Sequence, residues 1–269
     1  MIFKDDTGFP PGTIVVAASM QPRFYEFLMS MERLLVPSGT RYLLSRGCDI
    51  THNFNDGIQK ASGDWIWFMG DDHSFAPDML LKLLAHRVSI VIPPTSCKII
   101  PWLPCIMHGN GTLTSWKSSM PLYTWAELSH KKLFALPVGD FIGQAGMLVS
   151  RAVFNDWPYP WFKAGQQDPG LLQEDMTFCR ELQARGNTIY IDAGQILDHW
   201  SICGITTRFH NGEYVPGLIW GDEVVTLPDA LADRQPDGST RLRRAVPFDI
   251  NNGSPQPFPS RIPAGLEDV

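Results

Sequence analysis

Short apolar runs alternate with amphipathic segments along the first third of the chain. The runs that predict strands are Thr13–Ala18, Thr40–Ser45, Asp64–Gly70 and Ser89–Thr95. Between them, apolar residues recur at helical spacing, which predicts helices in Gln21–Leu35, Asn55–Ser62 and Ala76–Arg87. Strands that alternate with helices in this way form βαβ units, so the sequence predicts an α/β fold with a mainly parallel sheet flanked by helices.

The middle of the chain lacks a clear period. Residues 99–134 combine Pro, Gly, Ser and Trp, which predicts loops and short irregular strands over the sheet. The pattern then resumes: Gly143–Phe154 predicts a strand followed by a helix start, and Leu171–Gly186 predicts an amphipathic helix that ends at its glycine. Asn187–Gly194 predicts one more strand.

From about Glu223 onward, Pro, Asp, Asn, Gly and Ser predominate. This composition predicts an irregular C-terminal extension over residues 223–269, extended or partly disordered, after one domain that occupies residues 1–222.

Composition narrows the function classes. Hydrophobic residues make up 44% and charged residues 19% of the 269 residues, as in a soluble globular protein. The formal net charge of -6 provides no broad basic field for a nucleic-acid backbone. No apolar run reaches the ~18 residues of a membrane-spanning helix and the N-terminus lacks an apolar signal core, so we expect a cytoplasmic location. The five cysteines include no Cys-x-x-Cys pair, which favours reduced thiols over a disulfide or zinc framework.

Charged residues follow the predicted strand Asp64–Gly70 directly. Asp71, Asp72 and His73 therefore stand at the carboxyl end of a strand, where open α/β sheets bind their ligands. Adjacent carboxylates repel each other and need a compensating cation, an arginine or water. Mg²⁺ and Mn²⁺ take carboxylate oxygens, and Mn²⁺ also accepts imidazole. The alternative is an exposed turn, in which Asp72 or Ser74 caps the next helix.

A second acidic pair and a histidine occur later in the chain. Glu174 and Asp175 open a predicted helix, where carboxylates also interact favourably with the helix dipole. His199 comes shortly after the predicted strand Asn187–Gly194, and a histidine in such a place is either a packing residue or a ligand. Each of these signals has an ordinary structural explanation when it is considered alone.

The order of the motifs carries more information. The stretches "NDGIQKASGDWIWFMGDDHSFAPDML", "GQAGMLVSRAVF" and "EDMTFCRELQARGNTIYIDAGQILDHW" together resemble the GT-A glycosyltransferases, most closely the family-2-like group that uses nucleotide sugars. The resemblance covers about Thr13 to Trp200. It implies a GT-A (Rossmann-like) domain that binds a nucleoside diphosphate sugar beside a divalent metal ion, Mn²⁺ or Mg²⁺.

The resemblance also implies roles for particular residues. The family's metal-binding motif falls on Asp72 and Asp71, with His73 beside them and His199 as the late metal ligand. The family has an aspartate where this chain has Gly70, so a shift of the ligand assignment by one residue is left open, and Asp72 is the preferred ligand. The family's catalytic base falls on the pair Glu174 and Asp175, of which we prefer Asp175. The residues implied in donor binding are Asn55, Gly57, Asp71, Arg46 and Gly146. Many relatives have an acidic residue that reads the base where this chain has Ser45, Arg46 and Gly47, so the base is left open.

Two further groups are weaker candidates. The aromatic residues of "DWPYPWF" (Trp157, Tyr159, Trp161 and Phe162) could stack on a sugar or pack against the core, and we favour packing for all but Trp161. Arg208 and His210 could reach diphosphate oxygens if their segment folds over the donor.

The functional hypothesis is thus a metal-dependent glycosyltransferase, inverting with Asp175 as base, with a retaining mechanism as the alternative. The acceptor is left open among protein, glycan, lipid carrier and modified DNA base. One rival is a nucleotidyltransferase, which would have a glycine-rich basic loop after its first strand; "AASMQPRF" has one arginine and no glycine. The other rival is a non-catalytic nucleotide- or sugar-binding module, and the joint presence of both acidic pairs and His199 argues against it.

Overall fold

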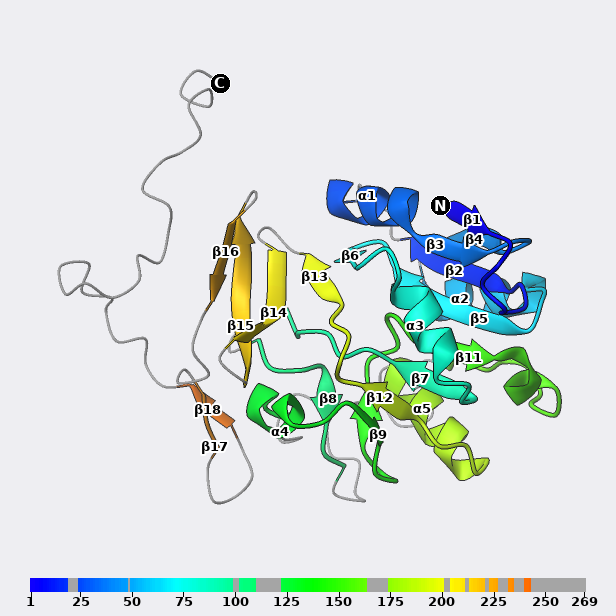
Figure 1. Ribbon diagram of the computed structural model, residues 1–269. Helices are drawn as coiled ribbons and strands as arrows, with labels where there is room; N and C mark the ends of the chain where they lie inside the picture. The colour runs from blue at the N-terminus through cyan, green and yellow to red at the C-terminus, as the bar shows by residue number, and fades with distance from the viewer. Residues whose placement is uncertain are drawn as a thin grey trace.

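The computed structural model describes residues 1–18, 24–47, 49–98, 102–109, 122–163, 174–200, 204–210, 213–220, 223–226, 232–234 and 240–242 (Figure 1). Within this part of the chain no helix is long and apolar enough to cross a membrane.

A seven-stranded sheet with the order β4-β2-β5-β11-β7-β12-β9 forms the centre of the fold. Its strands are β2 (Thr13–Ala18), β4 (Arg41–Arg46), β5 (Trp65–Gly70), β7 (Ile90–Ile92), β9 (Leu133–Ala135), β11 (Leu148–Ser150) and β12 (Tyr190–Asp192). β2 runs parallel to β4 and β5, β12 runs parallel to β7, and β11 and β9 are antiparallel to their neighbours. Five of the seven strands therefore point the same way, which confirms the predicted α/β fold with a mainly parallel sheet.

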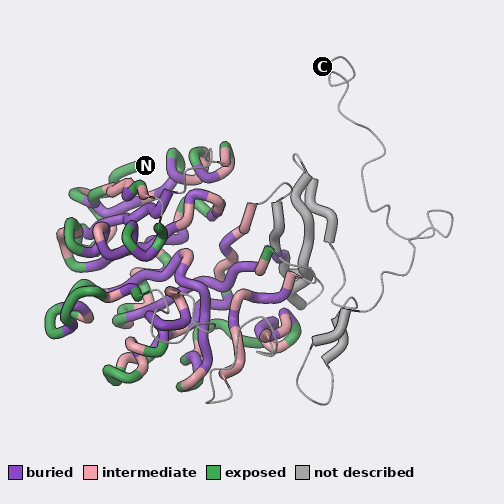
Figure 2. Tube along the Cα trace, turned by 180° about the vertical axis from the view of Figure 1, so that it is seen from behind, coloured by how far each residue is buried: buried purple, intermediate pink, exposed green. Residues whose placement is uncertain are grey.

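Helices cover both faces of this sheet. They are α1 (Tyr25–Arg33), α2 (Ile50–Lys60), α3 (Met79–Ala85) and α5 (Glu174–Ala184). Since successive strand residues point to opposite faces, β2 sends Ile14 and Val16 to the core under α1 and α3, and Val15 and Ala17 to the core under α2 and α5. Buried segments run through the middle of this domain, and exposed segments lie on its outer loops and helices (Figure 2). Burial on both faces explains why these strands are continuous apolar runs in the sequence.

A second sheet lies beside the first, with the order β16-β15-β14-β13-β6 (Figure 1). Its strands are β6 (His73–Ser74), β13 (Asp198–Trp200), β14 (Gly204–His210), β15 (Glu213–Trp220) and β16 (Glu223–Thr226). β5 ends only two residues before β6 begins, so the chain passes from one sheet to the other at Asp71 and Asp72. The predicted acidic motif therefore occupies the junction of the two sheets.

The remaining elements are short. They are β1 (Ile2–Lys4), β3 (Leu35–Pro37), β8 (Ile106–Met107), α4 (Trp125–Ser129), β10 (Phe141–Ile142), η1 (Arg151–Phe154), β17 (Ala232–Arg234) and β18 (Thr240–Leu242).

Several element boundaries differ from those predicted. α2 begins at Ile50 rather than at Asn55, because the Asp49 side chain accepts a hydrogen bond from the Thr51 amide (3.0 Å) and caps the helix there. The helix expected after β11 is one 3₁₀ turn, η1. The loops expected over residues 99–134 include a short helix, α4, whose start is fixed by a capping box between Thr124 and Glu127. Of the predicted helix Gln21–Leu35, residues 21–23 lie outside the described residues and α1 ends at Arg33.

The segment predicted as a C-terminal extension contains strands. β16 begins at Glu223 and pairs with β15, and β17 pairs with β18. Residues 243–269 lie outside the described part of the chain, so the domain boundary at residue 222 stays a prediction.

Candidate functional site

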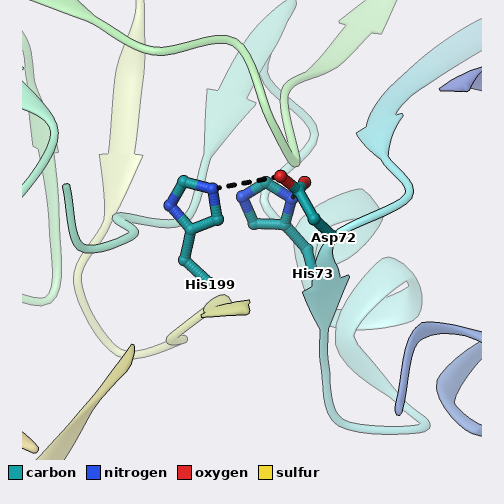
Figure 3. A group of neighbouring side chains, drawn as sticks. All are labelled: Asp72, His73 and His199. Atoms are coloured by element: carbon teal, nitrogen blue, oxygen red, sulfur yellow. Dashed lines mark ion pairs between the residues drawn. The ribbon is translucent and has the colours of Figure 1, made fainter. Parts of the chain in front are cut away.

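Asp72, His73 and His199 come together at the junction of the two sheets (Figure 3). The antiparallel pairing of β6 with β13 places His73 directly opposite His199, and the Trp200 amide donates to the Asp72 carbonyl (2.7 Å). Asp72 Oδ1 is 2.8 Å from His73 Nδ1, and Asp72 Oδ2 is 3.4 Å from His199 Nε2. The two imidazole rings stack with their centroids 4.2 Å apart.

A backbone carbonyl sets the orientation of His199. Its Nδ1 is 2.8 Å from the carbonyl oxygen of Ser96, which can only accept, so Nδ1 carries the proton. In the neutral ring Nε2 then presents its lone pair toward the carboxylate of Asp72. This is the usual arrangement of a metal-ligating histidine, whose second nitrogen is held by a carbonyl or a carboxylate.

His73 is buried without an ordinary hydrogen-bonding partner. Although Nδ1 is close to Asp72 Oδ1, neither ring nitrogen makes an aligned hydrogen bond within the described residues. Burial lowers the pKa of His73 against the opposing effect of Asp72, so the ring is neutral at pH 7. Burial alone would raise the pKa of Asp72, but the His73 and His199 rings outweigh it and hold that pKa well below its ordinary value. Asp72 therefore stays ionised beside the two imidazole rings.

The donor set fits a divalent metal ion. One carboxylate oxygen and two ring nitrogens, each from a different residue, lie within 4.8 Å of one another. A mixed set of this kind suits Mn²⁺ better than Mg²⁺, which prefers oxygen ligands alone. Asp71, also predicted as a ligand, is buried next to Asp72 but does not belong to this group.

Gly70 leaves room for the ring of His73. A Cβ atom at position 70 would lie 2.7 Å from Asp72 Oδ1 and 2.9 Å from His73 Nδ1, both too close. The imidazole therefore occupies space that an aspartate at position 70 would need. This gives a physical reason why the chain departs here from the GT-A pattern.

The second acidic pair opens α5. Burial, with the charge of Glu174 as a further cause, raises the pKa of Asp175 to about 7, and burial also raises the pKa of Glu174. Asp175 Oδ1 accepts a hydrogen bond from the Met176 amide (2.7 Å). A carboxylate with a pKa near 7 can both take and release a proton at neutral pH, as a general base must.

The segment Thr95–Lys98 makes contacts toward both acidic pairs: Lys98 contacts Asp72, and Thr95 is hydrogen-bonded to Cys105, which lies near Asp175. A Cβ atom on Gly143 would lie 3.0 Å from Cys105 Sγ and 3.6 Å from Asp175 Oδ2, so the thiol and the carboxylate both border this glycine. The Cys105 amide donates to the Thr95 carbonyl (2.7 Å), one residue before the Ser96 carbonyl that holds His199. A hydrogen bond with Cys97, together with burial, raises the pKa of the Cys105 thiol, which is therefore protonated at neutral pH.

Two of the predicted donor-binding residues have packing explanations. Asn55 is buried; its Nδ2 donates to the Phe162 carbonyl (2.8 Å) and its Oδ1 accepts from the amides of Trp161 and Phe162 (3.0 Å each). A Cβ atom on Gly57 would lie 2.3 Å from a methyl carbon of Val15, so glycine lets α2 approach β2 closely. The structure does not bring these residues to the Asp72 cluster, and their role in donor binding stays a prediction.

Of the other three donor-binding candidates, Asp71 directly follows β5, and Arg46 and Gly146 lie at or near the end of a strand. Arg46 is exposed at the carboxyl end of β4. Gly146 has a φ of +83°; its amide donates to the Phe68 carbonyl and its carbonyl accepts from Trp67 Nε1 (2.8 Å each). Glycine is favoured in this left-handed conformation whether or not a ligand binds beside it, so the conformation alone explains the glycine.

The aromatic segment packs largely into the core. The Phe162 and Phe178 rings stack at 4.0 Å, and those of Trp157 and Phe178 at 5.4 Å, which supports packing for the first residue of each pair. Trp161 is half-buried, and Tyr159 is 56% exposed. Arg208 and His210 lie on β14, but their side chains are outside the described part of the structure.

Sequence reasoning missed Lys98, whose Nζ is 2.5 Å from Asp72 Oδ2. It also missed the Ser96 carbonyl and Asp49, whose charge contributes to the raised pKa of Glu174. A signal was available, because Ser96 and Lys98 follow β7 and Asp49 follows β4, and the carboxyl ends of parallel strands converge.

Comparison with known proteins gives a family match over the segment that contains Asp72 and His73. Residues 41–90, from β4 through the acidic turn to the start of β7, match the model of the glycosyl transferase family 2. The match confirms the resemblance to family-2 glycosyltransferases and supports glycosyl transfer at the level of the family. No match was found among curated proteins. Among solved structures, the crystal structure of A197 from STIV is 12% identical, with 86% of this chain and 94% of that chain covered and a TM-score of 0.46.

Proposed function

We propose that the protein is a metal-dependent glycosyltransferase that moves a sugar from a nucleoside diphosphate sugar to an acceptor hydroxyl. The observation that carries this proposal is the convergence of Asp72, His73 and His199 at the end of β5, where Asp72 and His73 belong to the segment that matches the family. The buried carboxylate of Asp175, with its raised pKa, supplies the second chemical group that such a transfer needs.

Asp72, His199 and His73 would hold the metal ion. The ion would supply positive charge that offsets the negative charge developing on the leaving diphosphate. The chain contributes the orientation: the Ser96 carbonyl fixes the ring of His199, and the β6–β13 pairing fixes both histidines relative to Asp72.

Asp175 would act as the base. Its carboxylate would take the proton of the acceptor hydroxyl as that oxygen attacks the anomeric carbon on the side away from the diphosphate, which inverts the configuration. Glu174 acts on this group through its charge, because a neighbouring carboxylate raises the pKa of Asp175.

A second candidate is a nucleotide-binding module that works without metal. The contact between Lys98 and Asp72 favours it, because the ammonium already neutralises the carboxylate. The two candidates differ in whether nucleotide binding needs a divalent ion.

Calorimetric titration with UDP, GDP, ADP, CDP and TDP, first with Mn²⁺ and then with a chelator, separates them. We expect one nucleotide to bind only with Mn²⁺, and Asp72→Ala to weaken that binding by about 100-fold or more, at least as much as the loss of an outer-shell partner at a metal site. The matched control is Asp78→Ala, which should have no effect, because Asp78 is a half-exposed aspartate paired with Lys82 on α3. Equal binding by Asp72→Ala and the unsubstituted protein would exclude the metal site.

A further inference from the structure

Lys98 lies where a divalent ion would contact Asp72. Its ammonium is 2.5 Å from Asp72 Oδ2, the same oxygen that lies 3.4 Å from His199 Nε2. A lysine ammonium and a divalent cation on one carboxylate oxygen repel each other strongly at such separations. Metal binding at Asp72 and His199 therefore requires the ammonium of Lys98 to move.

The structure allows that movement. The backbone before Lys98 is held by hydrogen bonds, since the Cys97 amide donates to the Leu103 carbonyl (2.8 Å) and the Ser96 carbonyl accepts from His199. The Lys98 side chain itself is 37% exposed, and its four-carbon stem can swing while the backbone stays fixed. The ammonium would then remain beside the site without staying on Asp72.

The diphosphate of a nucleotide sugar would provide a new partner for the Lys98 ammonium. The leaving group of a nucleotide sugar carries several negative charges, of which one divalent ion neutralises only part, and charge-assisted contacts from lysine to phosphate are among the stronger hydrogen bonds. Because the Lys98 ammonium contacts an oxygen of Asp72, phosphate oxygens that bind beside Asp72 would lie within reach of this side chain.

We propose that Lys98 is a cation that changes partners: it neutralises Asp72 before metal binds, and it pairs with the diphosphate of the donor afterwards. The inference rests on the proposed function, because it needs a metal site at Asp72. Lys98 thus competes with the metal and cooperates with the diphosphate, so its removal has opposite effects on the two ligands.

The test uses two probes on the full chain. Mn²⁺ binding is measured alone by electron paramagnetic resonance of the free ion, and inorganic pyrophosphate binding is measured by calorimetry at saturating Mn²⁺. Lys98→Met should bind Mn²⁺ about tenfold more tightly, and pyrophosphate about tenfold more weakly, the size expected for one charge-assisted contact. Lys98→Arg, which keeps the charge, should retain most of the pyrophosphate affinity.

Controls separate this inference from the proposed function. Lys82→Met removes a surface lysine that is paired with Asp78 and should change neither affinity. If Mn²⁺ does not bind, or binds equally to Asp72→Ala, the proposed metal site is wrong. If Mn²⁺ binding depends on Asp72 while Lys98→Met leaves either affinity within twofold of the original, the partner change is wrong and the metal site stands. Thermal unfolding of each variant verifies that it is folded.

Discussion

The two acidic pairs look alike in sequence and differ in chemistry. Asp72 has a pKa well below its ordinary value, because His73 and His199 surround a carboxylate whose Oδ2 also touches Lys98. Asp175 has a pKa of about 7, because it is buried and the nearest charge acting on it is another carboxylate, Glu174. One pair is thus suited to holding a cation and the other to holding a proton. The difference comes from the neighbours of each pair and is not visible in the dipeptides themselves.

The largest effect should come from removing the base. Asp175→Asn keeps the shape of the side chain but cannot accept the acceptor's proton, so turnover should fall by about 10²- to 10⁴-fold, the usual contribution of general base catalysis. The measurement is release of the nucleoside diphosphate from the donor found in the binding screen. Mn²⁺ binding should be unchanged, because Asp175 lies outside the metal cluster. Full turnover by a folded Asp175→Asn protein would assign the base to another residue.

The same substitution should stabilise the fold at high pH. The pKa of Asp175 is about 7 in the folded protein and 3.8 as a reference, so the folded state retains a proton that the unfolded state releases between these values. Stability therefore falls as pH rises from about 4 to 7, by on the order of 4 kcal/mol.

Asp175→Asn removes this loss. Its free energy of unfolding should exceed that of the unsubstituted protein most at pH 8, with little difference at pH 4. Chemical denaturation at both pH values is the measurement. A difference that does not grow with pH would mean that Asp175 is not a buried proton-binding group.

An intermediate effect should follow from enlarging Gly70. Gly70→Asp places side-chain atoms against Asp72 and His73, so Mn²⁺ affinity should fall by about tenfold or more. The double variant Gly70→Asp with His73→Ala should bind Mn²⁺ more tightly than Gly70→Asp alone, because removal of the ring leaves space for the new carboxylate. Electron paramagnetic resonance titration compares all three proteins. Unchanged affinity in Gly70→Asp would show that His73 does not depend on the glycine.

The smallest effect should be a shift of the pH profile. Turnover should rise with pH through about 7 as Asp175 loses its proton. Glu174→Gln removes a negative neighbour, so this limb should move to lower pH, by less than about one unit. Glu181→Gln, about two turns along the same helix, is the control and should leave the limb in place. A shift toward higher pH would contradict the assigned charge effect.

The parts of the structure that the sequence predicts well depend on local patterns. β2, β5 and β7 are continuous apolar runs because both faces of the sheet are covered, and such runs are easy to recognise. The pairing of β6 with β13 was not predictable, because these strands have two and three residues and no periodicity of their own. The early start of α2 depends on a cap by Asp49, which lies outside the predicted helix Asn55–Ser62.

Sequence reasoning likewise found some residues of the candidate site and missed others. Asp72, His73 and His199 were singled out from the motif order, and the structure brings them together. Lys98 was missed although it follows a predicted strand, because "TSCKII" shows only that it lies near the carboxyl edge of the sheet, and its contact with Asp72 depends on the fold. Asn55 was interpreted as a donor-binding residue, but its side-chain hydrogen bonds are made with the backbone of Trp161 and Phe162.

The short β6–β13 pairing has a consequence for the order of the chain as a whole. Ser74 and Trp200, hydrogen-bonded across this pairing, are 126 positions apart. Within the described residues, two residues of β6 pair the β13–β16 sheet with the end of β5, and the Trp200 amide adds a hydrogen bond to the Asp72 carbonyl. A cation held by Asp72 and His199 would close the same long loop a second time. The strand pairing has already cost the chain the entropy of loop closure, so the cation would not have to offset that cost again. Metal binding would therefore hold the second sheet more firmly against the first, and donor binding would make β14, β15 and β16 more rigid.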